Sequence, residues 1–180
     1  MRPILTIVFF CFLNSGLRAT TLVATDVPEM SREARAVALG RVVAVDSQWS
    51  ADRRRIETVV TLAAEEYLKG GLGSSVQFAI PGGELGRYRQ IVVGAPRVQV
   101  GERIVVFLGA RAPGIAFILG FNQGLFRVTL RDGAWLVAPA APIGPVAANR
   151  GVAPRRVPLT DFAREVRTLA TRPDPTRERR

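Results

Sequence analysis

Residues 36–45 read AVALGRVVAV and residues 56–68 read IETVVTLAAEEYL, and in both stretches apolar residues recur at every second position. A period of two is typical of β-strands, because successive side chains point to opposite faces of a sheet. Two shorter stretches, VQFAI (76–80) and IVVFL (104–108), continue the block. The last of these is apolar throughout, which predicts a strand that is buried on both faces.

The two-residue period indicates which side chains share a face of each predicted strand. In the first stretch we expect Val37, Leu39, Val43 and Val45 to share one face, and Gly40 to mark a bulge or a close backbone approach. The second stretch predicts a long strand with one buried and one solvated side. Its expected buried face comprises Ile56, Thr58, Val60, Leu62, Ala64 and Leu68.

Further strands are expected on the C-terminal side of the block. A glycine-rich, charged connection at 82–90 is followed by short apolar runs at 91–93 and 115–119. Apolar residues then alternate over 126–130 toward Asp132-Gly133, which predicts a two-residue hairpin turn because both positions favour positive φ. Several short strands with frequent turns indicate a closed antiparallel barrel or a sandwich.

Helices are expected on either side of these strands. Asp26 and Glu29 form a capping-box pattern at the start of a short helix. Residues 138–158 are rich in Pro, Ala and Gly and predict an irregular connection. Residues 159–170 predict a second helix with Thr160 as its cap. Its apolar stripe is expected to pack on the strands and comprises Leu159, Phe162, Val166 and Leu169.

The N-terminus has the pattern of a removable export signal. An apolar run at 4–13 follows Met1-Arg2 and is too short to span a bilayer, and Ala19 ends a small-residue cleavage motif. We therefore expect residues 1–19 to be removed and the mature chain to be periplasmic or secreted; the alternative is an N-terminal core strand or anchor. No later apolar stretch is long enough for a membrane helix, and residues 171–180 have the composition of a disordered basic tail.

Composition excludes several chemistries. The chain has no histidine, and its single cysteine, Cys11, lies within the expected signal. A Ser-His-Asp or Cys-His site is therefore excluded, and the common zinc ligands are missing. Lys69 is the single lysine among 25 basic residues, in a chain of net charge +10 at pH 7. Such a bias toward arginine reflects genome composition, so abundant arginine is not in itself evidence of function.

Few residues are suited to catalysis, and we predict a protein that is not an enzyme, with no cofactor and no metal site. A carboxylate-based hydrolase would have to bring together distant acids such as Glu84 and Glu102. A serine–lysine pair would have to join Lys69 to Ser74 or Ser75. The simpler interpretation is that these are solvated turn acids, turn serines and a lysine at the end of a strand.

Two segments are candidate binding surfaces. The first is the glycine-rich connection with its cationic, aromatic rim, because loops on a rigid scaffold often carry recognition. It comprises Gly82, Gly83, Glu84, Gly86, Arg87, Tyr88 and Arg89. The second is a basic patch that would attract polyanions. It comprises Arg53, Arg54, Arg55 and Arg97.

A resemblance supports the expected fold. Residues 34–43, together with 56–70, resemble the netrin-like module of tissue inhibitors of metalloproteinases. Gly82-Gly83-Glu84 and Gly101-Glu102 also resemble segments of a group of exported bacterial proteins. The resemblance implies an OB-like five-stranded barrel with packed helices. In that family, inhibition depends on an N-terminal cysteine that chelates zinc, whereas the mature chain here is expected to begin at Thr20 without cysteine. The resemblance therefore implies the fold and not the inhibitory mechanism.

These observations predict a single exported OB/netrin-like barrel domain over residues 20–137, which includes a short N-terminal helix. A C-terminal helix over residues 159–170 is expected to pack on the barrel. The expected function is a non-catalytic binding or interaction module. Its partner would be a protein or an anionic envelope component; specific nucleic-acid binding is not expected, because basic residues are not interleaved with enough aromatics. A carboxylate-based hydrolase and a structural envelope component are the alternatives.

Overall fold

Strands dominate the part of the chain that the computed structural model describes, residues 26–109, 115–140 and 156–171. The strands are β1 (Ala36–Trp49), β2 (Ile56–Lys69), β3 (Ser75–Pro81), β4 (Gly83–Leu85), β5 (Tyr88–Gln90), β6 (Arg103–Gly109), β7 (Ala116–Ile118), β8 (Leu125–Arg131), β9 (Ala134–Pro139) and β10 (Val157–Pro158). The helices are α1 (Val27–Glu33), the short 3-10 helix η2 (Phe121–Gly124) and α2 (Leu159–Thr171). The prediction of a mainly β chain with a helix on either side of the strands is confirmed.

Three of the predicted segments lie largely outside the residues that the structure describes. The expected signal at 1–19, most of the connection at 138–158 and the tail beyond residue 171 lie outside the described residues.

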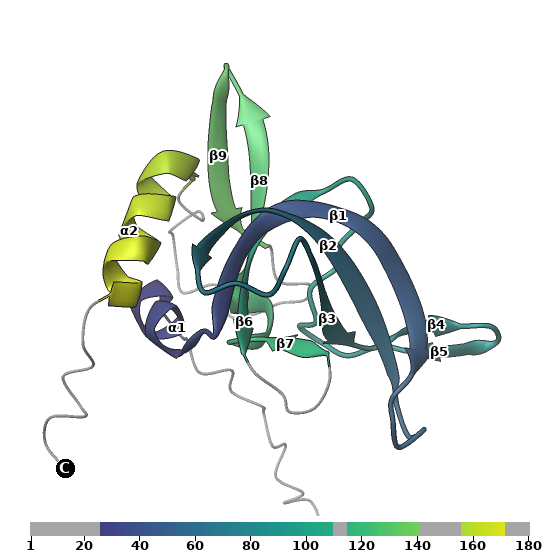
Figure 1. Cartoon of the computed structure of the whole chain (residues 1–180). Helices are drawn as coiled ribbons and strands as arrows, with labels where there is room; N and C mark the ends of the chain where they lie inside the picture. The colour runs from purple at the N-terminus through teal and green to yellow at the C-terminus, as the bar shows by residue number, and fades with distance from the viewer. Residues whose placement is uncertain (1–25, 110–114, 141–155, 172–180) are drawn as a thin grey trace, which may run out of the picture.

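Five strands form a closed ring. The large sheet has the order β1-β2-β3-β7-β6-β8-β9-β10, and β1 also pairs with β6 (Figure 1). Along one edge of β6, Ala36 to Arg41 pair with Leu108 to Arg103, and along the other edge β7 and β8 follow one another. β7 closes the ring through only two residue pairs with β3, Phe78–Ala116 and Ala79–Phe117. This pairing is parallel, so the prediction that all the strands are antiparallel is wrong here.

The backbone of β1 makes the predicted close approach at Gly40. A Cβ atom at this position would collide with the carbonyl oxygen of Ala63, and the β1–β2 register shifts between Leu39 and Gly40. A second shift follows between Val42 and Ala44. Only the shift between Val42 and Ala44 changes the phase of the strand: Val37 and Leu39 lie in one buried cluster, Val45 packs with Val42 against another, and Val43 is 48% exposed. The predicted common face of Val37, Leu39, Val43 and Val45 is therefore wrong.

The sheet has apolar clusters on both of its faces. The inner cluster lies within the ring and includes Val42, Val60, Leu62, Val76, Phe78, Ile80, Ile104, Val106 and Leu108. The outer cluster lies between the sheet and the two helices and includes Met30, Val37, Leu39, Val105, Phe107, Phe126, Val128, Phe162 and Val166. β6 contributes to both clusters in alternation, which confirms the prediction of a strand buried on both faces.

The two helices lie together against the outer cluster (Figure 1). Asp26 caps α1 as predicted, since its Oδ1 accepts from the Glu29 amide at 2.8 Å. α2 begins at Leu159, so Thr160 lies inside the helix and the predicted capping role is wrong. Phe162 and Val166 of the predicted stripe are buried. No helix in the described part of the chain is long and apolar enough to cross a bilayer.

β8 and β9 form a hairpin that projects beyond the ring (Figure 1). Its turn residues Asp132 and Gly133 have φ angles of 49° and 77°, which confirms the predicted hairpin turn. Leu130 and Trp135 pair near the end of this hairpin and are exposed, because the strands there extend past the core.

Candidate functional site

The glycine-rich connection folds as a short β-hairpin, β4–β5, that lies beside one end of the β1–β2 pair (Figure 1). β4 and β5 are joined by Gly86-Arg87, where Gly86 has a φ of 59°, as the first position of a two-residue type II′ turn requires. All seven residues of the first candidate surface belong to this hairpin or to Gly82 before it. The sequence predicted a connection here and missed the two strands, because three-residue strands carry no periodic pattern.

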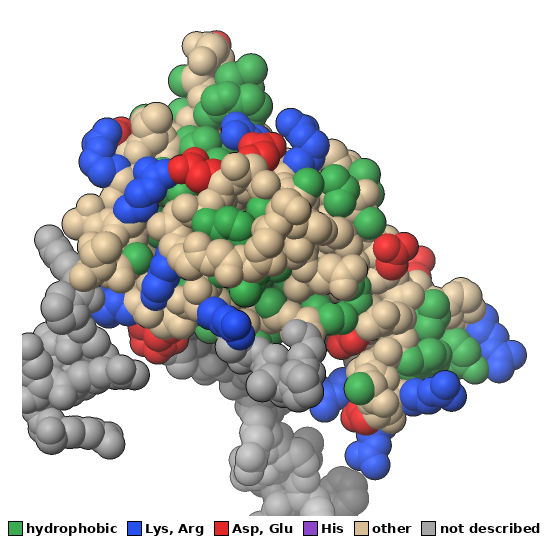
Figure 2. Space-filling view, in the orientation of Figure 1, with side chains coloured by type: hydrophobic (Ala, Val, Ile, Leu, Met, Phe, Trp, Pro, Cys, Tyr) green, Lys and Arg blue, Asp and Glu red, His purple; other side chains and the backbone are tan. Residues whose placement is uncertain are grey.

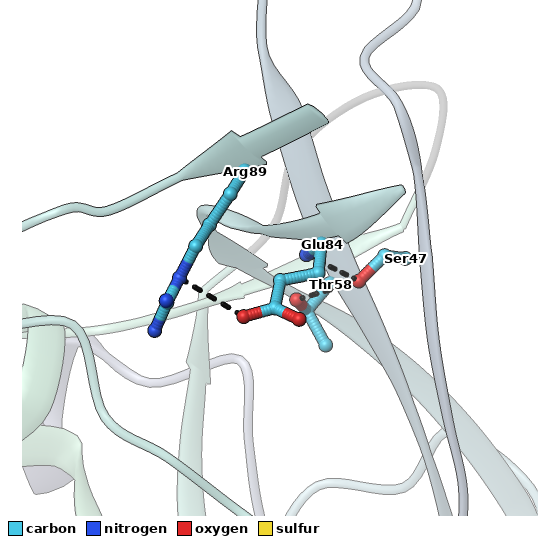
Figure 3. Close-up of polar contacts among 4 residues, drawn as sticks. All are labelled: Ser47, Thr58, Glu84 and Arg89. Carbon is cyan, nitrogen blue, oxygen red and sulfur yellow. Dashed lines mark hydrogen bonds and ion pairs between the residues drawn. The ribbon is translucent and has the colours of Figure 1, made fainter. Parts of the chain in front are cut away.

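A chain of hydrogen bonds anchors the hairpin to β1 and β2 (Figure 3). The Glu84 amide donates to Ser47 Oγ at 3.3 Å, and the Thr58 hydroxyl donates to the Gly82 carbonyl at 2.7 Å. Ser47 Oγ and Thr58 Oγ1 lie 3.4 Å apart. Since Thr58 uses its proton on Gly82, Ser47 is the donor between the two hydroxyls. At the same end of the hairpin, where Gln90 pairs with Gly83, the Ile56 amide donates to Gln90 Oε1 at 2.6 Å.

Gly83 allows this close approach. Its φ is 148°, and a Cβ atom would lie 2.6 Å from both Ser47 Oγ and Thr58 Oγ1. Both hydroxyls sit on strands of the ring, so they have little room to move away. The presence of glycine at positions 82 and 83 is therefore explained by the fold, without a ligand. Only glycine lets the hairpin lie against β1 and β2.

Replacing Gly83 should detach the hairpin while the ring stays folded. Gly83→Ala is expected to cost roughly 1–3 kcal/mol, because the added carbon forces the two hydroxyls and the hairpin apart. Hydrogen–deuterium exchange should rise in residues 82–90 and at the Ile56 amide, which donates to Gln90, and remain unchanged in residues 59–68 of β2. Gly71→Ala is the matched control, since a Cβ atom there meets nothing within 4 Å. Equal exchange of the hairpin in both variants would contradict the anchoring role.

An aromatic contact joins the two candidate surfaces. Trp49, at the end of β1, packs edge-on against Tyr88 of β5 with ring centroids 5.5 Å apart. The Arg87 guanidinium lies 5.0 Å from the Tyr88 ring centroid, and its Nη2 donates to the Tyr88 hydroxyl at 2.8 Å. The turn after Trp49 carries Arg53, Arg54 and Arg55, so these arginines and the hairpin belong to one end of the molecule. We call this end the basic tip: residues 49–55 and 82–90.

The turn that carries the three arginines is held by its own polar groups. Asp52 Oδ1 accepts from the Ser50 hydroxyl at 2.6 Å and from the Arg54 amide at 3.1 Å. The bond from Ser50, and then that from Arg54, lower the pKa of the Asp52 carboxyl below 3.8. Asp52 therefore stabilises the turn fully above pH 3.8, and this contribution is lost as the pH falls through its folded-state pKa.

A groove of about 590 Å³ opens beside the hairpin. Val45, Ile80 and Val98 line it from the side of the core, and Glu84, Arg89 and Arg97 supply its charged groups. Glu84 and Arg89 form an ion pair at 2.9 Å across the hairpin (Figure 3). Arg97 thus meets the first candidate surface across this groove, rather than extending the patch of Arg53, Arg54 and Arg55.

The outer wall of the groove is the segment 91–99, which has a turn at residues 93–94 and is otherwise irregular; the strand expected at 91–93 is absent from this part of the described chain. Ile91 and Val93 are 68% and 84% exposed. The segment is tied to the sheet through the Arg97 carbonyl, which accepts from Arg127 Nη2 at 2.6 Å. Gly94 lies against the ring of Phe121. Figure 2 shows apolar side chains flanked by basic ones at the β4–β5 end of the molecule.

The residues that a hydrolase would need are occupied elsewhere. Glu84 pairs with Arg89, and Glu102 Oε1 lies 3.5 Å from Arg127 Nε. Their backbones bond to β1 at the positions of Ser47 and Val42, which are separated by roughly 16 Å along a strand. Within the described residues, no three His, Cys, Asp or Glu side chains are grouped to hold a metal ion.

Lys69 forms its hydrogen bonds with α1, and not with Ser74 or Ser75. Its Nζ donates to the carbonyls of Ser31 at 2.8 Å and Arg32 at 2.7 Å, at the C-terminal end of that helix. Burial lowers the pKa of the Lys69 ammonium below 10.5, and the two carbonyls oppose this shift because they favour the charged form. The interpretation of Lys69 as a structural residue at the end of a strand is supported by these contacts.

Sequence reasoning missed three features of this site: the hydroxyl anchors Ser47 and Thr58 and the exposed rim of Ile91 and Val93. Thr58 carried a usable signal, because it was the one hydroxyl on an otherwise apolar face and a buried hydroxyl needs a partner. The exposure of Ile91 and Val93 carried no signal, since an apolar run ordinarily predicts burial.

No protein-family model matches the chain, and neither a curated protein nor a solved structure matches it. Its function is therefore inferred from its own residues.

Proposed function

We propose that the mature chain is an exported, non-catalytic binding module of OB/netrin-like architecture, which binds its partner through the basic tip and the adjoining groove. The ring of five strands with packed helices supports the architectural part of this proposal. An OB-like barrel characteristically presents loops at its rim for binding, and the β4–β5 hairpin occupies such a place.

One observation carries the proposal. Two segments far apart in the chain, 49–55 and 82–90, meet through the Trp49–Tyr88 contact and combine five arginines with exposed aromatic rings. Large apolar side chains that stay exposed beside a groove are typical of interaction surfaces. The anchoring of the hairpin to β1 and β2 holds these groups in place before a partner arrives, which lowers the entropic cost of binding.

Replacing two arginines of the hairpin tests the proposal. Immobilised mature protein should capture a partner from an envelope extract, and Arg87→Ala with Arg89→Ala should reduce capture by about tenfold or more. The melting temperature should barely change, since exposed arginines contribute little to folding. Arg131→Ala with Arg156→Ala is the matched control, because these exposed arginines lie away from the basic tip. Equal capture by both double variants would contradict the proposed binding surface.

Export is the second part of the proposal and has its own test. The apolar run at 4–13 and the small-residue motif ending at Ala19 support cleavage after Ala19. N-terminal sequencing of the product recovered from a periplasmic or culture fraction should begin at Thr20. An intact Met1 in a cytoplasmic fraction would contradict the proposed compartment.

A further inference from the structure

We infer that the partner of the basic tip is the surface of an anionic lipid membrane, on which the protein docks peripherally. This inference rests on the proposed function and names the chemistry of the partner. It is carried by three observations: adjacent arginines in excess of acids, an aromatic pair at the same end, and exposed aliphatic side chains beside them.

The arginines of the β1–β2 turn outnumber the one acid beside them, Asp52, which interacts electrostatically with Arg55. Elsewhere in the described chain, Arg103, Arg127, Arg164 and Arg167 each pair with an acid, and Arg35 and Arg131, which are exposed without an ion pair, are not adjacent to another arginine. By contrast, the exposed side chains of Arg53, Arg54 and Arg55 make no ion pair or hydrogen bond with the described residues, although they are consecutive and repel one another. This concentration at one turn is independent of the general excess of arginine. Three adjacent guanidinium groups suit a surface of many phosphates.

The aromatic side chains at the tip are of the types that prefer the boundary of a bilayer. Trp49 and Tyr88 are both exposed and pack on one another, and the Tyr88 hydroxyl, which accepts from Arg87 Nη2, keeps its own proton to donate. Tryptophan and tyrosine are enriched at membrane interfaces because they combine an apolar ring with a polar group.

Exposed aliphatic residues distinguish a membrane from a soluble polyanion. Ile91 follows β5 directly, and Val93 is the most exposed of the large apolar side chains in the described chain. A sulfated glycan or a nucleic acid would leave both side chains in water, whereas the acyl boundary of a bilayer removes them from it. Apolar side chains flanked by arginines are the combination that binds both parts of a lipid layer.

Vesicle binding by the mature chain tests this inference. Sedimentation with phosphatidylcholine vesicles that contain phosphatidylglycerol should bind the protein, and pure phosphatidylcholine vesicles should bind it much less. Arg53→Gln, Arg54→Gln and Arg55→Gln together should weaken binding by roughly fivefold per arginine. The control carries Arg35→Gln, Arg131→Gln and Arg156→Gln, which remove the same charge from exposed positions away from the tip. An equal loss in both triple variants would mean attraction by net charge alone and would overturn the inference.

The aliphatic contribution needs a separate variant. Ile91→Ser with Val93→Ser should weaken binding to anionic vesicles by about tenfold, because buried apolar area is lost. Val43→Ser with Leu130→Ser, which changes exposed apolar residues elsewhere, should leave it unchanged. If dextran sulfate in solution binds as well as vesicles, and the Ile91/Val93 variant binds both normally, the partner is a soluble polyanion and the inference fails.

Tryptophan fluorescence reports which end of the molecule enters the membrane. Trp49 and Trp135 are the two tryptophans, so Trp135→Phe leaves Trp49 as the sole reporter. Its emission should shift to the blue on anionic vesicles and be quenched by brominated lipid. In Trp49→Phe, the remaining Trp135 should not respond; a response of Trp135 alone would assign docking to the β8–β9 hairpin and overturn the inference.

The two proposals can fail separately. Loss of partner capture in the Arg87/Arg89 variant, without any binding to vesicles, would overturn the membrane inference and leave the binding surface supported, with a protein as its partner. Vesicle binding that does not depend on the basic tip, together with unchanged capture, would overturn both.

Discussion

Leu62→Ala is expected to lower the free energy of unfolding by roughly 2–5 kcal/mol. Leu62 has no exposed surface and lies in the inner cluster, where its strand neighbours are Val42 on β1 and Val76 on β3. Alanine removes its apolar contacts and leaves a cavity, which the paired strands on both sides cannot close. Denaturation in urea, with the midpoint and slope compared with those of the parent chain, measures the loss.

Thr61→Ala is the matched control for this substitution. Thr61 lies on the opposite face of β2, is partly exposed and accepts only a 3.3 Å hydrogen bond from Gln77. Its replacement should cost less than about 1 kcal/mol. A loss as large as that of Leu62→Ala would contradict the assigned phase of β2.

Phe162→Ala is expected to cost roughly 3–5 kcal/mol and to release α2 from the sheet. Phe162 is 5% exposed, and its ring lies 5.0 Å from that of Phe126 and 6.4 Å from that of Phe107. These three aromatic rings form the centre of the outer cluster. Without Phe162, the helix keeps only Val166 and Ala163 as fully buried side chains.

The effect should be visible in the helical signal. Circular dichroism at rising urea should show helix lost before sheet in Phe162→Ala, whereas the parent chain loses both together. Glu165→Ala changes an exposed residue of the same helix and should alter stability by less than about 0.5 kcal/mol. Coincident loss of helix and sheet in Phe162→Ala would show that α2 does not depend on this contact.

Much of the strand arrangement could be predicted from local pattern. The alternation in β2 from Ile56 to Leu62 and in β3, the apolar run of β6 and the Asp132-Gly133 turn each reflect a physical constraint within a few residues of sequence. The predicted common face of β2 is wrong at Leu68, which lies in the outer cluster, whereas Val60 and Leu62 lie in the inner one. Predictions failed where a distant contact decides the outcome. Val45 lies on the opposite face from Val37 and Leu39 because the β1–β2 register shifts between Val42 and Ala44.

The burial of side chains on the second face of β2 likewise could not be predicted from the sequence. The alternation places Val59 on the solvated side with Thr61, yet Val59 is 7% exposed. The prediction that this side of β2 is solvated is therefore wrong at Val59. A two-residue period shows which side chains share a face of a strand. It does not show which other elements cover that face.

The candidate site could be predicted in composition and not in geometry. Its hairpin residues were recognised because Gly82-Gly83 and the Arg87–Arg89 rim stand out against the strands. The joining of this hairpin to the Arg53–Arg55 turn depends on Trp49 meeting Tyr88, a contact between segments with no shared sequence signal. The groove depends in turn on the path of residues 91–99, which is set by Arg127 and Phe121 far along the chain.

The pairing of β1 with β6 also sets the order in which the chain can assemble. β1–β2 and β2–β3 join neighbours in sequence, but the ring closes only when Ala36 reaches Leu108. Closing so long a loop costs entropy before any contact compensates for it, so refolding is expected to take roughly milliseconds to seconds. Before the ring closes, the edges of β1 and β6 are unpaired and can pair with strands of other chains. Aggregation is therefore expected mainly during this stage of refolding, when the concentration of unfolded protein is high.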